Sequence, residues 1–290
     1  MFDFIQKNQK GFTLIELLIA MAVFLVVIAA LSSTFVFQRK TYDAQQQVNE
    51  MVQNGRAAVD LMTGEIMMTG YGVATKYLPL SNWIKPADAG GVTFVNDPVL
   101  IEDGAGALGS DILHVAGCSD GPATTLSATA SSGATTITVT DGSDFNTTTK
   151  RNICINGLET AVVTGVSGNT LTVDTDPTTT GDQGLAENYN VSATTVDICV
   201  VKVISYEIVL DDDGSYTLKK DENLGAGRQP LAENIIDMQI TQVPSTGAIM
   251  GVEINPLTAR TDKPDPNYSQ NSGYRTYDLR SFVTPPNLGF

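Results

Sequence analysis

The sequence predicts an α+β protein, in which one long N-terminal helix, half of it transmembrane, packs on an antiparallel β-sheet that carries a β-rich insertion. Three observations predict this class. A long apolar run follows residue 11, and an amphipathic helical pattern continues from it with no proline before residue 79. The rest of the chain alternates strand-like runs with turns rich in Gly, Asp and Ser.

Composition divides the 290 residues into four parts. We expect residues 1–11 to form a short basic leader and residues 12–38 to form the transmembrane half of the helix. Residues 39–118 and 198–290 together are expected to build one α+β domain outside the membrane. Residues 119–197 are dense in threonine and are expected to form a β module inserted into that domain.

The apolar segment KGFTLIELLIAMAVFLVVIAAL occupies residues 10–31, and uncharged residues continue to Gln38. This length is sufficient to cross a bilayer core of ~30 Å. One acid, Glu16, interrupts the segment near its start. A carboxylate at the centre of a spanning helix costs about 2.5–3.5 kcal/mol on insertion scales, and less near the end. Retention of an acid in such a place indicates that it has a function.

The run GFTLIELLIA resembles the N-terminus of type IV pilins and of type II secretion pseudopilins. In that family a prepilin peptidase cuts after the glycine at the cytoplasmic face of the membrane and methylates the new N-terminal residue. The resemblance implies a pilin-like fold, cleavage between Gly11 and Phe12, and N-methylation of Phe12. It also assigns Thr13 and Glu16 to assembly, in which the glutamate pairs with the N-terminal amine of a neighbouring subunit.

Two other interpretations of the segment fit it less well. A secretory signal peptide requires a small-residue cleavage site after its apolar run, whereas here the candidate cleavage site precedes the run. A plain membrane anchor explains the length but neither Gly11 nor Glu16. Positive charges flank the span on both sides, so the orientation with the leader in the cytoplasm follows from the resemblance and not from the positive-inside rule.

The pattern of residues after the apolar span predicts that the helix continues with one apolar face. Gly70, Tyr71 and Gly72 are expected to end it. A short coiled coil is the alternative, but the pattern covers only about three heptads. The residues of the stripe are spaced alternately four and three apart, and they are Val48, Val52, Gly55, Val59, Met62, Ile66 and Thr69.

Residues 54–72 (NGRAAVDLMTGEIMMTGYG) resemble a segment of PilW-type minor pilins, and residues 231–243 and 274–288 resemble later segments of the same family. The resemblance implies a structural minor pilin that is incorporated into a type IV pilus or primes its assembly. The implied partners are the prepilin peptidase, other major and minor pilins, and the bacterial inner membrane. The implied location is a single-pass inner-membrane protein with a periplasmic domain, which later becomes extracellular in the pilus.

Two alternative functions remain open. A J-type minor pseudopilin of a type II secretion system would share the helix and the sheet. A pilus-displayed adhesin would use residues 119–197 to bind a receptor. Nucleic acid is excluded as a partner, because a formal net charge of −15 repels phosphate backbones.

Within the inserted module, Ser132–Asp141 (SGATTITVTD) and Ser167–Asp176 (SGNTLTVDTD) are similar to each other. Each is expected to form a turn that leads into an alternating strand. A disordered Thr-rich linker is the alternative. The alternation of apolar residues between the two copies favours an ordered β module.

The three cysteines, Cys118, Cys154 and Cys199, contain no C-x-x-C pair, so zinc binding is not indicated. An exported protein lies where disulfides persist. We favour a Cys118–Cys199 disulfide, because these two residues flank the insertion. Three buried thiols are the alternative.

Two other patterns suggest chemistry that their context does not support. Residues 104–109 match G-x-G-x-x-G, but a strand-like run follows where a dinucleotide site needs a helix. His114, the only histidine, alternates with apolar neighbours and is expected to face a sheet. No catalytic set emerges, so neither an enzyme nor a cofactor is expected.

The run DDDG at residues 211–214 predicts a hairpin turn between two alternating strands, Ile198–Leu210 and Ser215–Asp221. Its Asp211 and Asp213 are weak calcium candidates, because hard cations bind carboxylate oxygens. The spacing of an EF-hand is absent, so a solvated turn is the default interpretation.

Overall fold

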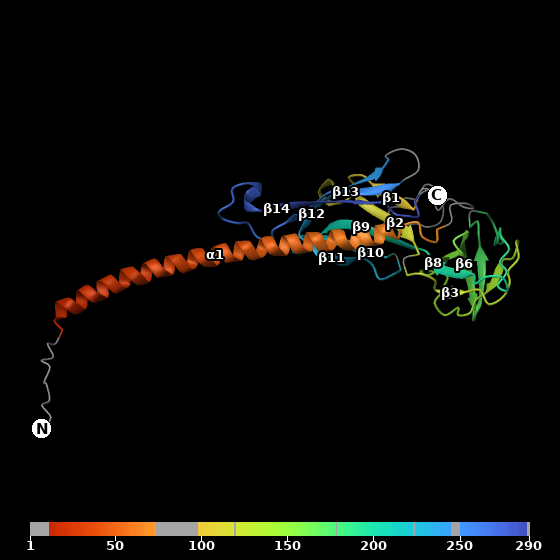
Figure 1. The fold of residues 1–290 in the computed structure, drawn as a ribbon, viewed down its shortest axis with the longest axis horizontal. Helices are drawn as coiled ribbons and strands as arrows, with labels where there is room; N and C mark the ends of the chain where they lie inside the picture. Colours follow the sequence, from red (N-terminus) through yellow and green to blue (C-terminus); the bar gives the residue numbers. More distant parts are fainter. Residues whose placement is uncertain are drawn as a thin grey trace, which may run out of the picture. The chain divides into compact units, whose positions relative to one another are not determined.

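The computed structural model describes residues 12–73, 98–118, 120–177, 179–222, 224–244 and 250–288. The chain forms two compact units, residues 1–49 and residues 50–290. Its long helix α1 (Leu14–Met67) contributes to both units. The expected α+β class is confirmed, because α1 is followed by a series of antiparallel strands (Figure 1).

The strands and short 3-10 helices that follow α1 are, in chain order, β1 (Val99–Glu102), η2 (Ala107–Gly109), β2 (Ile112–Gly117), β3 (Thr124–Thr125), β4 (Thr136–Thr138), β5 (Asn152–Ile155), β6 (Glu159–Ser167), β7 (Thr170–Asp174), β8 (Asp197–Val200), β9 (Lys202–Leu210), β10 (Tyr216–Asp221), β11 (Gln229–Glu233), β12 (Ile235–Val243), β13 (Gly251–Arg260), η3 (Asn271–Gly273) and β14 (Thr276–Val283). They form three sheets with the orders β1-β2-β9-β10-β11, β12-β13-β14 and β3-β8-β5-β6-β7-β4. Neighbouring strands pair antiparallel in all three sheets.

Helix α1 is 54 residues long, which corresponds to ~80 Å at the α-helical rise of about 1.5 Å per residue. No proline interrupts it. Its end lies where the sequence predicts, at two glycines with positive φ, Gly70 (78°) and Gly72 (66°). The Gly70 amide does not donate to a carbonyl of the helix. It donates instead to the carbonyl of Ala116 at the end of β2. The helix end is therefore joined to the five-stranded sheet.

In the second unit, α1 packs on the sheets through a face wider than the predicted stripe. Of the predicted stripe, Val48 belongs to the first unit, and Val52, near the start of the second unit, is only half-buried. Two residues outside the predicted stripe, Met51 and Ala58, are buried instead. A sheet surface is broad, so it covers residues on both sides of a helical stripe, which periodicity alone does not predict. The buried residues of α1 are Met51, Gly55, Ala58, Val59, Met62 and Ile66.

Gly55 is the point where α1 approaches the three-stranded sheet most tightly. A Cβ atom placed on Gly55 would lie 2.5 Å from Cδ1 of Leu279 in β14 and 3.3 Å from Cβ of Ala259 in β13. By contrast, nothing lies within 4 Å of a Cβ placed on Gly64 of the same helix. The glycine at residue 55 is therefore required by packing and the one at residue 64 is not.

Asp111 joins the five-stranded sheet to the three-stranded sheet. Its buried carboxylate accepts hydrogen bonds from the amide of Gly104 (2.9 Å) and from the amide of Ile240 in β12 (2.7 Å). Its own amide donates to the Met238 carbonyl. The G-x-G-x-x-G run at residues 104–109 is thus a loop with the 3-10 turn η2, followed by strand β2 and not by a helix.

The Thr-rich region forms the six-stranded sheet. The two similar segments do form turns, at Gly133 (φ 82°) and Gly168 (φ 58°), and each turn is followed by a strand, β4 and β7 respectively. These strands pair with each other, with Thr136 opposite Thr172. One side of the sheet covers a core of buried residues: Leu126, Ala130, Ile137, Val139, Phe145, Ile153, Ile155, Ala161, Val163, Leu171, Val173, Leu185, Tyr189, Val196 and Ile198.

The inserted six-stranded sheet extends beyond residue 197, the end of the inserted module predicted from the sequence. The run Ile198–Leu210 is not one strand, because it is interrupted at Val201 between β8 and β9. Strand β8 pairs with β3 and β5, whereas β9 pairs with β2 and β10. Residues up to Val200 therefore belong to the inserted sheet. Apolar alternation continues through both strands, so it could not reveal that they pair in different sheets.

We predict that replacement of Gly55 by leucine destabilises the second unit by about 1–3 kcal/mol, because an added side chain would overpack the contact between α1 and Leu279. The measurement is urea unfolding of the full chain in detergent.

The matched control is the same replacement at Gly64, which should leave the free energy of unfolding unchanged or raise it, since glycine is a poor helix former. Equal losses of stability in the two variants would contradict the packing argument.

Candidate functional site at the N-terminal helix

The start of α1 holds a reciprocal cap between Thr13 and Glu16. The Glu16 carboxylate accepts hydrogen bonds from the amide and from the hydroxyl of Thr13, both at 2.9 Å. The Glu16 amide in turn donates to the Thr13 hydroxyl oxygen at 3.3 Å. This arrangement is a capping box, which satisfies donors that the first turn of a helix otherwise leaves without partners. Gly11, on the other side of the expected cleavage point, lies outside the described residues.

The capping box gives Glu16 a local role that the family resemblance does not imply. A Thr-x-x-Glu spacing is a sequence signal for a helix start, so this role was available from the sequence. The carboxylate also lies in the first turn, where the positive end of the helix dipole favours negative charge. These interactions offset part of the cost of a carboxylate in an apolar segment.

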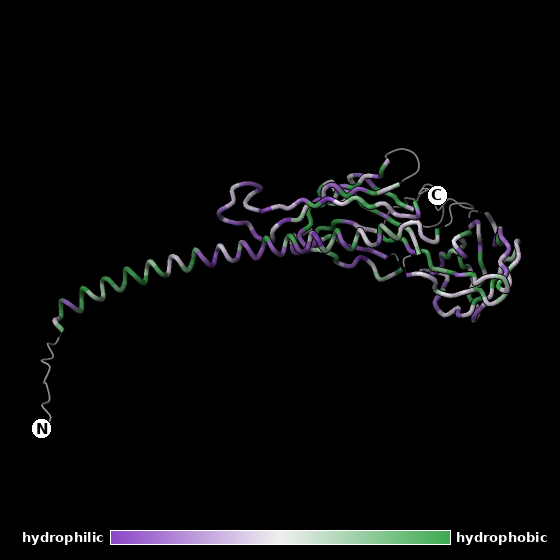
Figure 2. The backbone as a smooth tube through the Cα atoms, in the orientation of Figure 1, coloured by the Kyte–Doolittle hydropathy of each residue, from purple (hydrophilic) through white to green (hydrophobic). Residues whose placement is uncertain are grey.

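The first half of α1 consists mainly of hydrophobic residues (Figure 2), and their side chains are exposed. Phe12 is 91% exposed, and no residue of the helix before Met51 is buried. The hydroxyls of Ser33 and Thr34 both donate to the Ala30 carbonyl, at 2.8 and 3.0 Å, so they add no unsatisfied donor to the span. By length and composition this helix is able to cross a membrane.

Glu65 attaches the last turns of α1 to the five-stranded sheet. Its carboxylate accepts hydrogen bonds from the hydroxyl of Tyr206 in β9 and from the ammonium of Lys220 in β10. Burial raises the pKa of the Tyr206 hydroxyl, and the Glu65 charge adds to the effect. Burial acts to lower the pKa of Lys220, but Glu222 and Glu65 outweigh it, so this pKa is raised. Glu65 therefore binds one neutral donor, the Tyr206 hydroxyl, and one charged donor, the Lys220 ammonium.

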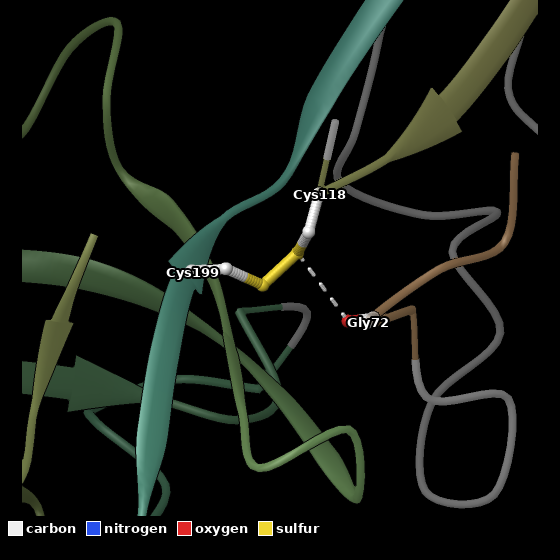
Figure 3. The surroundings of a disulfide bond; sticks show 3 residues. All are labelled: Gly72, Cys118 and Cys199. Atoms are coloured by element: carbon white, nitrogen blue, oxygen red, sulfur yellow. Dashed lines mark hydrogen bonds between the residues drawn. A yellow bond between two sulfur atoms is a disulfide. The ribbon is translucent and has the colours of Figure 1, made fainter. Parts of the chain in front are cut away.

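The structure joins Cys118, just after β2, to Cys199 in β8 by a disulfide (Figure 3). The bridge closes a loop with a sequence separation of 81 residues, so it fixes the two ends of the inserted module to each other. Gly72 packs directly against it. A Cβ on Gly72 would lie 2.6 Å from the Cys118 sulfur and 2.9 Å from the Cys199 sulfur. A glycine is therefore needed where the chain leaves α1.

His114 faces a sheet, as the alternation predicts, and it has a hydrogen-bond partner on each ring nitrogen. Nδ1 lies 2.8 Å from the Ser205 hydroxyl in β9, and Nε2 lies 2.7 Å from the Glu102 carboxylate in β1. His114 as a whole is 1% exposed. Burial lowers the pKa of His114, and the hydrogen bond and charge of Glu102 oppose the effect without cancelling it. The folded protein therefore holds a neutral imidazole that bridges β1 and β9.

The two calcium candidates lie in the β9–β10 turn. The Asp211 carboxylate is 2.5 Å from the ammonium of Lys219, and the Asp213 carboxylate accepts bonds from the amide (2.9 Å) and hydroxyl (2.6 Å) of Ser215. These contacts lower the pKa of both carboxyl groups. Their oxygens stabilise the hairpin turn, and within the described residues no group of three or more His, Cys, Asp or Glu side chains is placed to hold a metal ion.

Comparison with known proteins bears on the N-terminal segment. Residues 6–32 match the family model described as "Prokaryotic N-terminal methylation motif". This match supports a type IV pilin-like or pseudopilin-like prepilin, processed by a prepilin peptidase, and it points to a structural subunit rather than an enzyme. Together with the apolar helix, it fits a membrane-anchored pilin that assembles with other pilins. Searches of curated proteins and of solved structures found no match to the chain.

We predict that the free energy of unfolding falls as the pH drops below about 6.5, because the histidine of the unfolded chain then binds a proton that buried His114 resists. Above that pH the contribution of the neutral ring is fully present. The measurement is urea unfolding between pH 7.5 and 5.5, where one proton accounts for a slope of at most about 1.4 kcal/mol per pH unit.

The control is His114→Gln, which keeps a polar side chain but does not titrate. Its pH dependence over this range should be flatter than that of the wild type. Identical slopes in the two proteins would show that His114 is not responsible.

Proposed function

We propose that the protein is a PilW-like minor pilin, cleaved between Gly11 and Phe12, N-methylated on Phe12, and incorporated into a type IV pilus or active in priming its assembly. The observation that carries the proposal is the match of residues 6–32 to the methylation motif, directly followed by a helix whose first half is apolar and exposed. The resemblance of residues 54–72 to minor pilins supports the finer assignment.

The physical basis of assembly lies in the two halves of α1. Before assembly, the bilayer covers the apolar half, and the rest of the chain lies in the periplasm. In the filament, helices of other pilins take the place of lipid around the same side chains. The second half stays docked on its own sheets through the buried face from Met51 to Ile66. The subunit is therefore extracted from the membrane without unfolding.

Glu16 is the residue that changes partner in this proposal. Its carboxylate accepts two hydrogen bonds from Thr13, the second residue of the processed chain, and so lies at the helix end from which cleavage creates a new amine. The charged amine of a neighbouring subunit would bind the same carboxylate more strongly than these neutral donors do. The capping box holds the acid at the helix start until that amine arrives.

We predict that Gly11→Glu blocks removal of the leader, because the peptidase recognises the residue before the cut. The measurement is the size of the protein on a gel after expression with a prepilin peptidase, with Gly64→Glu on the exposed face of α1 as the control. A mature-size band from Gly11→Glu would contradict the assignment of the cleavage point.

We predict that Glu16→Ala and Glu16→Gln are both processed normally but are both lost from sheared filaments. Glutamine retains the capping-box hydrogen bond but not the charge, so it separates the two roles of Glu16. The measurement is the ratio of mutant to wild-type protein in purified pili, with Glu50→Gln on an exposed part of α1 as the control. Incorporation of Glu16→Gln at the wild-type level would show that the cap, and not the charge, is what assembly needs.

A further inference from the structure

A third cysteine lies beside the disulfide. Cys154 of β5 is directly opposite Cys199 of β8 in the antiparallel register of the inserted sheet. All three cysteines belong to one buried apolar cluster, together with residues such as Val162 and Val201. Cys118 and Cys154 are 0% exposed and Cys199 is 8% exposed. Cys154 is not part of the disulfide, so a thiol and a disulfide are packed together in the interior.

The backbone pairing of β5 with β8 fixes how the two cysteines face each other. The amide of Asn156 donates to the Asp197 carbonyl (2.7 Å) and the amide of Val201 donates to the Asn152 carbonyl (2.8 Å), on either side of the cysteine pair. Directly opposite residues project from the same face of a sheet. In a hydrogen-bonded pair their Cα atoms are about 5.5 Å apart, which lies within the range that a disulfide spans.

The surroundings allow the side chains to move. Cys154 and Cys199 both line a cavity of about 190 Å³, which extends to Tyr71 and Gly72 at the end of α1. Close-packed interiors resist rotation of side chains, whereas a cavity on one side removes that obstacle.

We propose that Cys154 is the internal nucleophile of a thiol–disulfide exchange that converts the Cys118–Cys199 bridge into a Cys154–Cys199 bridge. The thiolate of Cys154 attacks the sulfur of Cys199, a new S–S bond forms between them, and the Cys118–Cys199 bond breaks. Cys118 leaves as a thiolate and takes up a proton in place of the one that Cys154 released. One disulfide and one thiol are present before and after, so the step needs no oxidant or reductant.

The released Cys118 thiol has an acceptor in place. Its sulfur lies 3.7 Å from the carbonyl oxygen of Gly72 (Figure 3). A disulfide sulfur carries no proton, so this contact becomes an S–H···O hydrogen bond only when Cys118 is a thiol. The product state therefore gains an interaction that the starting state lacks.

The exchange would change what the disulfide constrains. In the Cys118–Cys199 form, the bridge ties β8 of the inserted module to the end of β2 in the five-stranded sheet. In the Cys154–Cys199 form, it ties two strands that are already neighbours in the inserted sheet. The disulfide cross-link between the two sheets is then lost, although the main chain still joins β8 to β9 through Val201, and the disulfide within the inserted sheet takes its place. The position of the disulfide thus determines whether the inserted sheet is cross-linked to the five-stranded sheet.

The first experiment follows the thiol in the full-length wild-type protein, held in detergent at pH 8.5 without added thiol. Samples are quenched in acid, denatured, labelled with an alkylating agent and mapped by peptide mass spectrometry. Label should appear on Cys118 with time as label on Cys154 falls by the same amount. Because only the thiolate attacks, and a thiol with the ordinary pKa of about 8.5 is mostly protonated at pH 7, the transfer should be at least several-fold faster at pH 8.5 than at pH 7.

The second experiment uses variants that retain two cysteines. Cys118→Ser should form a Cys154–Cys199 disulfide when exported to an oxidising compartment, whereas Cys154→Ser should form Cys118–Cys199 and show no transfer of label. Label confined to Cys154 in the wild type at every time and pH would overturn the proposal, as would a Cys118–Cys154 bridge. None of these outcomes depends on whether the protein enters a pilus, so the proposal is tested separately from the proposed function.

Discussion

The rest of the structure depends on the contrast between the two halves of α1. The first half exposes apolar side chains that no other described residue of its own unit covers, and such a surface is not stable in water. The second half places one apolar face against sheets and leaves only a few apolar residues, such as Leu61 and Met67, exposed. A single uninterrupted helix thus belongs to two environments. A lipid bilayer and a bundle of similar helices are the two surroundings that satisfy the first half.

Under the proposed function, the second unit has to hold its part of α1 firmly while the first half of the helix changes its surroundings. Close contact at Gly55, the Glu65 carboxylate bound by Tyr206 and Lys220, and the hydrogen bond from Gly70 to Ala116 hold the helix along much of its docked length. The last of these contacts lies next to the disulfide. The end of α1, the end of β2 and the base of the inserted module therefore meet in one place, where Gly72 packs against the bridge.

Much of this architecture could be predicted from the sequence because it follows from local patterns. Periodicity and the absence of proline predict α1, the Asp-Gly turn predicts the β9–β10 hairpin, and the internal similarity predicts β4 and β7. The sequence could not show that β4 and β7 pair with each other, that the strand-like run breaks at Val201, or that Cys154 lies opposite Cys199. These features depend on register between distant segments, for which local periodicity carries no information.

The most direct test of the account is the N-terminal mass of the protein after expression with and without a prepilin peptidase. The account predicts a chain that begins at N-methylated Phe12 only when the peptidase is present. A chain that still begins at Met1 in the presence of active peptidase would contradict it. The apolar half of α1 would then be a simple membrane anchor, and the exchange of lipid for neighbouring helices would lose its basis.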